Sequence, residues 1–410
     1  MNENTNGISF DDTQVAFAYK TDAQLKKAHF LFSSMGKPWL VNLGLKITPY
    51  AIKWHVPFTK TVIRNTIFQQ FVGGETLNET AKAADKLEEY KVQAILDYGV
   101  EGKEGEDSFE QARDEFKKVI AYAATQANIP FMSIKVTGFA RFALLEKLDN
   151  SMHTAEGTLM KRYLQAVETL DAPEKEEWHR VRLRMLHICE EAAAKKIGVL
   201  VDAEETWIQD PVDALTILMM DTFNKGKAVV YNTIQLYRHD RLAFLKDSCA
   251  AAAERNFILG AKLVRGAYME KERERAATMN YPSPIQASKE ATDKDYNAAV
   301  AFCVEQIHQV AFIVASHNEY SNLFATQLLD HDGLPHSHPH VHFSQLYGMS
   351  DNITFNLAKS GCSVSKYLPF GPINDVVPYL MRRAQENSSV AGQTGRELAL
   401  IKKEMRRRGI

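Results

Sequence analysis

Two adjacent arginines, Arg382 and Arg383, lie in a stretch near the carboxyl end of the sequence whose composition suits anion binding. The stretch covers residues 366–387 and reads KYLPFGPINDVVPYLMRRAQEN, with a helical pattern after Pro372. Adjacent residues of a helix point about 100° apart, so both guanidinium groups cannot lie on one solvated face. We therefore expect one arginine of the pair to be turned toward a buried anion.

Polar side chains also recur at the ends of short apolar segments that are typical of buried strands. These segments are residues 93–99, 131–137, 197–204, 228–235, 258–266, 312–318, 340–346 and 363–369. Most are separated by helical patterns, and eight such strands are the number in a (β/α)8 barrel, whose active site lies at the carboxyl ends of the strands. The polar residues at or near these ends are Lys135, Asp202 with Glu204, Gln235, Arg265, His317 with Asn318, and Tyr367.

The elements that carry these residues suggest three parts of the chain. We expect an N-terminal helical arm over residues 1–92, a distorted (β/α)8 TIM-like barrel over 93–390, and a C-terminal helix over 391–410. The interval between strands 2 and 3 is too long for one crossover, so residues near 139–195 are predicted to form a helical insertion. The arm contains WLVNLGLKITPYAIKWHVPF, which either packs on the barrel or forms a basic and aromatic surface for lipid headgroups.

Composition limits the class of protein. The 410 residues carry a formal net charge of −2, which gives no support for nucleic-acid binding. The four cysteines show no CxxC spacing, so neither a disulfide framework nor a zinc ribbon is expected, and a reducing compartment fits best. No signal-peptide pattern and no run of 18 apolar residues occurs. We expect a cytoplasmic protein, with peripheral contact to the inner face of the membrane as an open alternative.

The segment GAKLVRGAYMEKERERA, residues 260–276, is a candidate for ligand contact. Lys262 and Arg265 differ by three positions, so they tend to face opposite sides of a strand, and Gly266 permits close approach of the backbone to a ligand. Two solvated charges beside a turn are the simpler alternative. Neither GxGxxG nor GxxxxGK[ST] is present, so a Rossmann or P-loop phosphate site is not supported.

The histidine-rich segment HDGLPHSHPHVH, residues 331–342, raises the alternative of a metal-dependent barrel hydrolase. His340 and His342 share one face of a predicted strand, as metal ligands do in some barrels. The remaining histidines lie in a Gly/Pro loop with no fixed geometry, so a polar loop leading into a strand is favoured.

Six stretches, in order between residues 131 and 390, resemble those of proline dehydrogenases, the flavin-dependent enzymes of proline catabolism. They are VDAEETWIQ, NTIQLY, GAKLVRGAYMEKERERAA, ASHN, QLYGMSDN and KYLPFGPINDVVPYLMRRAQENS. The resemblance is greatest to the single-function enzymes. It implies an FAD-binding barrel that oxidises L-proline to Δ1-pyrroline-5-carboxylate by hydride transfer to the flavin, with a quinone as electron acceptor. This reaction is the first step of proline catabolism.

The resemblance also implies roles for individual residues. The substrate carboxylate would be held by Arg382, Arg383 and Lys135. Glu386 would orient the arginines through an ion pair within the helix, and Asp202 would position Lys135 or the pocket tyrosine. The residues implied to surround the proline ring are Tyr268, Leu346, Tyr367 and Tyr379. The residues implied to bind FAD are Gln235, Lys262, Arg265, Gly266, His317 and Asn318.

Two positions depart from many relatives. Lys262 replaces an arginine, which keeps the charge and loses the planar fork, and Met269 replaces an aromatic residue that would stack on the cofactor. The same fold and cofactor also serve 4-hydroxyproline dehydrogenases. We expect Tyr367 to crowd a ring hydroxyl and so to favour plain proline. A catalytically silent barrel is a further alternative, and the nearly complete set of site residues disfavours it.

Overall fold

The computed structural model describes residues 7–54, 56–99, 104–389 and 391–410. The described residues form eight strands, which close into a parallel barrel in chain order. They are β1 (Gln93–Tyr98), β2 (Phe131–Ile134), β3 (Gly198–Val201), β4 (Val230–Gln235), β5 (Leu259–Val264), β6 (Val310–Ala315), β7 (Val341–Leu346) and β8 (Val364–Phe370). The predicted (β/α)8 fold is therefore confirmed.

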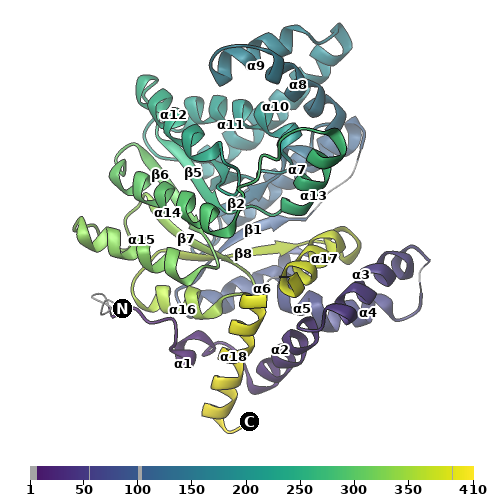
Figure 1. The fold of residues 1–410 in the computed structure, drawn as a ribbon, viewed down its shortest axis with the longest axis vertical. Helices are drawn as coiled ribbons and strands as arrows, with labels where there is room; N and C mark the ends of the chain where they lie inside the picture. The colour runs from purple at the N-terminus through teal and green to yellow at the C-terminus, as the bar shows by residue number, and fades with distance from the viewer. Residues whose placement is uncertain (1–6, 55, 100–103, 390) are drawn as a thin grey trace. The chain divides into compact units, whose positions relative to one another are not determined.

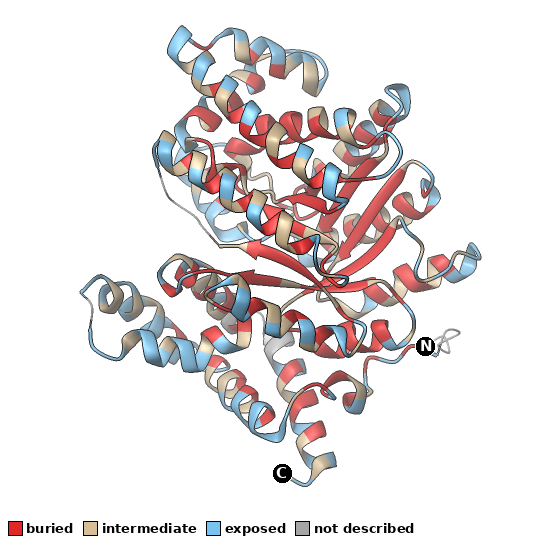
Figure 2. Ribbon diagram, turned by 180° about the vertical axis from the view of Figure 1, so that it is seen from behind, coloured by how far each residue is buried: buried red, intermediate tan, exposed pale blue. Residues whose placement is uncertain are grey.

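Most strands are buried on both faces because helices cover the sheet outside and other side chains fill it inside. All six residues of β4 are buried, and Figure 2 shows the strands almost entirely in the colour of buried residues. The register is in phase along β1 and β8, from Gln93 opposite Ser365 to Tyr98 opposite Phe370.

Five strands end earlier than predicted, and three of them (β2, β3 and β6) end three residues earlier; β6 and β2 illustrate the cause. β6 ends at Ala315, because the next residues form the turn into a helix, and the side chain of Asn318 caps that helix by accepting a hydrogen bond from Ser321 N. β2 ends at Ile134, so that Lys135 lies just beyond the strand, before a short 3₁₀ turn. In both places polar residues that we assigned to the strand lie in the loop after it.

The chain forms two compact units. Unit 1 comprises residues 1–100 and 344–410, and unit 2 comprises residues 101–343. The predicted division into an arm, a barrel and a C-terminal helix does not coincide with these units and stays a prediction.

The helices of unit 2 include the insertion between β2 and β3, which is α8, α9 and α10 (Figure 1). The full set is α7 (Glu106–Ala123), η2 (Val136–Gly138), α8 (Phe142–Thr154), α9 (Leu159–Glu168), α10 (Ala172–Lys195), η3 (Thr206–Ile208), α11 (Gln209–Phe223), α12 (Arg241–Glu254), α13 (Met269–Met279), α14 (Lys289–Glu305) and α15 (Glu319–His331). Within the insertion, α10 begins as a separate helix just before Pro173, where Asp171 and Glu174 form a capping box.

The helices of unit 1 come from both ends of the chain. They are α1 (Thr13–Ala16), α2 (Asp22–Met35), α3 (Pro38–Lys53), α4 (Thr59–Ile63), the π-helical turn η1 (Arg64–Phe68), α5 (Gln69–Phe71), α6 (Leu77–Glu88), α16 (Asp351–Lys359), α17 (Ile373–Ser389) and α18 (Ala391–Arg408). Their core includes Phe32 of α2, Leu380 of α17 and Ile401 of α18. No helix among the described residues is both long enough and apolar enough to cross a bilayer.

Candidate active site

The arginine pair on α17 has one buried member. Arg383 is only 6% exposed, whereas Arg382 is half-buried, which is the difference that the helical spacing predicts. Arg383 Nη2 donates to Glu386 Oε1 at 2.5 Å, and this is the predicted ion pair within the helix. Burial raises the pKa of Glu386, while Arg383 and Arg382 act in the opposite direction.

One hydrogen-bond donor of Arg383 is unsatisfied. Arg383 Nε is buried and has no hydrogen-bond partner among the residues that the structure describes, and the same holds for the hydroxyl of Tyr379. The guanidinium lies over the Tyr379 ring, 5.2 Å from its centroid. Burial raises the pKa of Tyr379 well above its usual value, so its hydroxyl stays protonated. The site therefore offers buried donors that a ligand acceptor would satisfy.

Leu346 and Tyr367 are the other two predicted ring-pocket residues in unit 1. Leu346 ends β7 and Tyr367 lies within β8, and both are half-buried. A hydrogen bond from Tyr347 N to Tyr367 O at 2.9 Å joins the end of β7 to the middle of β8.

In unit 2, the predicted site residues Asp202 and Lys262 form an ion pair between the residue after β3 and the middle of β5. Lys262 is 5% exposed, so its charge is held inside the barrel by this carboxylate. From the sequence, we predicted that Asp202 would position Lys135 or the pocket tyrosine. We did not predict the ion pair with Lys262. Lys135 is half-buried and directly follows β2.

Gln235 ends β4 and is fixed by one hydrogen bond. Its Nε2 donates to the backbone oxygen of Glu204 at 2.9 Å. Its Oε1 is buried and accepts no hydrogen bond from any described residue. A carboxamide oxygen in this state can accept a hydrogen bond from a ligand donor.

Arg265 has several protein partners at the end of β5. Its Nε donates to Asp293 at 2.8 Å, its Nη1 to Ser316 Oγ at 2.7 Å and its Nη2 to Ser321 Oγ at 2.9 Å. Arg265 and Lys262 thus have different partners, as their spacing predicts. Asp293 already neutralises the charge of Arg265. The guanidinium that we predicted to contact FAD therefore also holds β5 to the loop after β6.

Gly266, which follows Arg265, has a φ of +137°. A Cβ added there would stand 2.5 Å from the ring of Tyr237, so only glycine fits. Tyr268, two residues later, is half-buried at the N-terminal end of α13. His317 is half-buried beside Asn318, whose side chain caps α15.

The histidine-rich segment is not arranged as a metal centre. His340 Nδ1 bonds to Ile307 O at 2.7 Å, and His336 pairs with Asp330 at 2.9 Å. His342 is buried edge-on against Phe131, and burial lowers its pKa to about 3. Over the described part of the chain, no three His, Cys, Asp or Glu side chains are grouped to hold a metal ion.

Two buried polar clusters were not predicted from the sequence. In unit 1, Lys366 pairs with Asp351 at 2.9 Å, and the Tyr19 hydroxyl donates to the same carboxylate at 2.7 Å. In unit 2, Gln209 and Asp213 are buried on α11, one turn apart. The only sequence signal was polar residues within the apolar pattern QDPVDALTILMM, which does not identify their partners.

Within unit 2, Asp202 and Lys262 are in contact, and Gln235 is bonded to the loop after β3. Within unit 1, Arg383, Glu386 and Tyr379 are in contact. The structure thus provides one group of buried donors on α17 and one group of polar strand ends in unit 2.

Comparison with known proteins gives a consistent result. The family described as proline dehydrogenase matches residues 80–396. "Proline dehydrogenase 1, mitochondrial" of Caenorhabditis elegans is 29% identical over 98% of this chain and 88% of its own length. "Hydroxyproline dehydrogenase" of Xenopus laevis is 32% identical over 98% and 90%, respectively. The crystal structure of proline utilization A from Bdellovibrio bacteriovorus has a similar fold, with a TM-score of 0.72 at 17% identity, over 95% of this chain and 42% of that chain.

Proposed function

Because the chain belongs to the proline dehydrogenase family, we propose that it oxidises L-proline to Δ1-pyrroline-5-carboxylate, the first step of proline catabolism. The observation that best supports this proposal is the buried Arg383, whose Nε lacks a partner among the described residues beside an equally unsatisfied Tyr379 hydroxyl. An amino-acid carboxylate is an anion of the size and acceptor capacity that these donors require.

In the proposed complex, Arg382 and Arg383 bind the carboxylate, and Lys135 supplies a third positive charge. Glu386 holds Arg383 in its rotamer, so the guanidinium is oriented before the substrate arrives. Positioning of this kind converts binding energy into a fixed approach of the reacting carbon.

The pyrrolidine ring would be enclosed by Tyr268, Leu346, Tyr367 and Tyr379. Three aromatic faces and one aliphatic side chain exclude water from the ring, and none of them has to accept a proton in the reaction. The role that we assign to this chain is to bind and orient the substrate and to exclude water.

FAD is the proposed cofactor, and the residues of unit 2 fit it. The unsatisfied Gln235 Oε1 offers an acceptor to a heterocyclic N–H, and Gly266 lies exposed just after β5. When bound, FAD would accept the hydride, with its two electrons, that leaves the ring carbon beside nitrogen. The proposed ligands are Gln235, Lys262, Arg265, Gly266, His317 and Asn318.

A dye-reduction assay with purified, FAD-supplemented protein tests this function. We expect L-proline to reduce the dye and the cyclic imine product to form in equal amount. Absence of both would contradict the proposal. A metal-dependent hydrolase, the alternative suggested by the histidines, would reduce no dye.

The second candidate substrate is 4-hydroxyproline, which is favoured by the similarity to the Xenopus enzyme of that name. Tyr367 is half-buried on β8, and we expect it to crowd a ring hydroxyl. The ratio of kcat/KM for the two substrates decides between them. A higher value for L-proline supports our assignment, and a higher value for 4-hydroxyproline reverses it.

Each turnover removes two electrons from proline, and we propose that a membrane quinone accepts them. The face of α3 and the turn after it support contact with a bilayer. Trp39, Leu43, Ile47, Tyr50 and Trp54 recur at helical spacing and are 47–72% exposed. Of the residues of α3, only Val41 is buried.

The surroundings of this face favour anionic lipid. Lys46 and Lys53 are exposed on the same helix, and Phe58, in the turn before α4, is 80% exposed. Aromatic residues beside lysines are typical of segments that lie in the headgroup region without crossing the membrane.

Co-sedimentation with vesicles that contain anionic lipid tests this contact. We expect the protein to pellet with the vesicles and a Trp54→Ser/Phe58→Ser variant to bind at least about tenfold less, since each buried aromatic contributes roughly 2 kcal/mol. Tyr320→Ser removes an aromatic side chain that is 64% exposed in unit 2 and serves as the matched control. Wild-type protein that stays in the supernatant, with and without L-proline, would exclude the lipid contact.

A further inference from the structure

The orientation of the Gln235 carboxamide is set by a chain of hydrogen bonds that leads away from the proposed cofactor site. Gln235 Nε2 donates to Glu204 O at 2.9 Å, and Glu204 N donates to Gln209 Oε1 at 3.0 Å. Gln209 Nε2 in turn donates to Asp213 Oδ1 at 2.8 Å, one turn further along α11. The four residues that form these hydrogen bonds are each at least nine-tenths buried, so water does not compete for the bonds.

Asp213, at the far end of this series, fixes the direction of all the hydrogen bonds in it. An ionised carboxylate can only accept hydrogen bonds, so Gln209 must present its NH₂ group to Asp213 and its oxygen to Glu204 N. The Glu204 carbonyl also only accepts, so Gln235 must present its own NH₂ group there. The reverse orientation of either amide would place two acceptors or two donors face to face.

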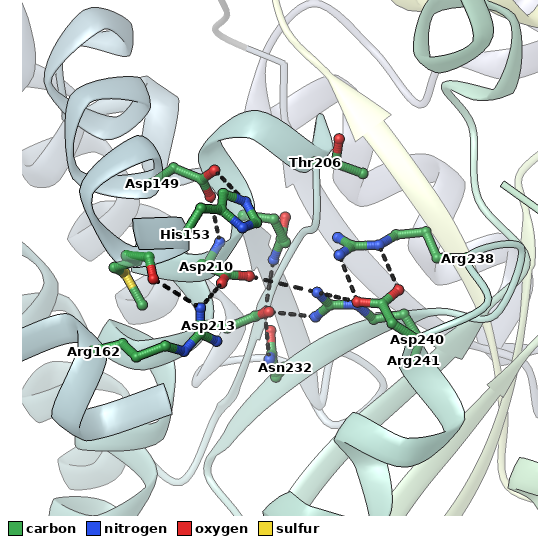
Figure 3. Close-up of polar contacts among 12 residues, drawn as sticks. Asp149, His153, Arg162, Thr206, Asp210, Asp213, Asn232, Arg238, Asp240 and Arg241 are labelled. Atoms are coloured by element: carbon green, nitrogen blue, oxygen red, sulfur yellow. Dashed lines mark hydrogen bonds and ion pairs between the residues drawn. The ribbon is translucent and has the colours of Figure 1, made fainter. Parts of the chain in front are cut away.

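Asp213 is also held by one cation and by a second amide. Its Oδ2 accepts from Arg241 Nη1 at 2.5 Å, and its Oδ1 also accepts from Asn232 Nδ2 at 2.8 Å (Figure 3). Burial raises the pKa of Asp213, whereas Arg241 and the Asn232 amide favour its ionised form. Arg241 is also 3.7 Å from Asp210 and 3.1 Å from Asp240, so it remains paired if Asp213 changes.

We propose that Asp213 is a positioning residue for the cofactor, which acts through Gln209 and Glu204 to aim the Gln235 Oε1 at an N–H donor of the bound ligand. This inference rests on the proposed function, since FAD is the ligand that it concerns. The oxidised isoalloxazine ring system carries one ring N–H, at N3, and that group is the donor that the Gln235 oxygen selects. In this proposal Gln235 contacts the ligand, and Asp213 acts on it through Gln209 and Glu204.

A double-mutant cycle on FAD affinity tests the relay. The dissociation constant of FAD is measured by fluorescence titration of apoprotein for wild type, Gln209→Leu, Gln235→Leu and the double variant. We expect Gln209→Leu to weaken FAD binding roughly three- to tenfold in wild type, because the freed Gln235 amide can rotate, and to have no further effect when Gln235 is already leucine. Equal effects of Gln209→Leu in both backgrounds would overturn the relay.

The ligand group is tested with 3-methyl-FAD, which lacks the N–H. We expect this analogue to bind more weakly than FAD to wild type, and the difference to disappear in Gln235→Leu. Equal loss in both proteins would overturn the assignment of N3–H.

Two further variants keep the relay test interpretable. Asp213→Asn preserves volume and removes the acceptor-only group, so it replaces Gln209→Leu if that variant does not fold, with the same expected direction. Thr216→Val, on the same buried helix, removes only a hydrogen bond to Val212 O, and its FAD affinity should match wild type. A wild-type protein that binds no FAD would overturn the proposed function itself, whereas normal binding with additive mutational effects would overturn only the relay.

Discussion

Replacement of Arg383 by methionine is the most informative single perturbation of the proposed carboxylate site. Methionine keeps most of the length and apolar volume of the side chain and removes the guanidinium. Arg383 is 6% exposed, so water cannot replace its donors at low cost. Its Nη2 is occupied by Glu386, and its Nε lacks a partner among the described residues, so Nε is the group that we expect to meet the substrate.

The expected loss follows from these contacts. One charge-assisted hydrogen bond to a buried carboxylate contributes about 1.5–3 kcal/mol, and loss of the positive charge adds to this. We expect kcat/KM for L-proline to fall roughly 100-fold or more, which corresponds to about 3 kcal/mol of lost stabilisation. Most of the loss should appear in KM, because the carboxylate is bound equally in the ground and transition states.

The assay compares L-proline with prolinamide, which has the same ring and no carboxylate. In wild type, kcat/KM should strongly favour L-proline. In Arg383→Met this preference should collapse, because prolinamide never used the charge. Arg396→Met serves as the control, since it removes an exposed arginine of α18 that pairs with Asp11 at 2.7 Å. Equal loss for both substrates in Arg383→Met would refute the reasoning and indicate a structural role.

Two further predictions concern stability. Gly266→Ala should lower the free energy of unfolding by about 2 kcal/mol or more, because of the positive φ and the contact with the Tyr237 ring. Gly226→Ala should not lower it, because the added Cβ meets nothing within 4 Å. Equal urea midpoints for the two variants would contradict this prediction. His153→Gln should destabilise the protein by less than about 1 kcal/mol at pH 6 and by nothing measurable at pH 9. The bond to Asp149 raises the pKa of His153 above 6.5, so its contribution is complete below that pH and is lost as the pH rises through the raised pKa. A difference between the two proteins that is independent of pH would show that the protonated histidine is not what stabilises the helix.

The sequence predicted the fold because its signals are local. Buried strands such as VAFIVA of β6 are recognisable from continuous apolarity, and the capping box of Asp171 and Glu174 marks the start of α10. The ion pair of Arg383 with Glu386 was equally accessible, because it depends only on helical spacing.

The parts that were missed depend on partners far away in the chain. Only the packed structure shows that Lys366 pairs with Asp351 and that Asp213 orients Gln209. A polar residue in an apolar segment of the sequence does not indicate which residue will bind it. The end of β6 was placed three residues too late, because Ser316, His317 and Asn318 were assigned to the strand, whereas they form the turn that Asn318 joins to α15 as its N-cap. The exposure of the aromatic side chains of the arm could not be read from the sequence, and the lipid contact that it favours stays a prediction.

The absorbance spectrum of the purified protein, recorded without oxygen before and after addition of L-proline, tests the central claim most directly. We predict the yellow spectrum of an oxidised flavin, with bands that bleach when L-proline is added and stay unchanged when the same amount of prolinamide is added at low concentration. A colourless protein that takes up no FAD, or a flavin spectrum that L-proline leaves unchanged, would contradict the account.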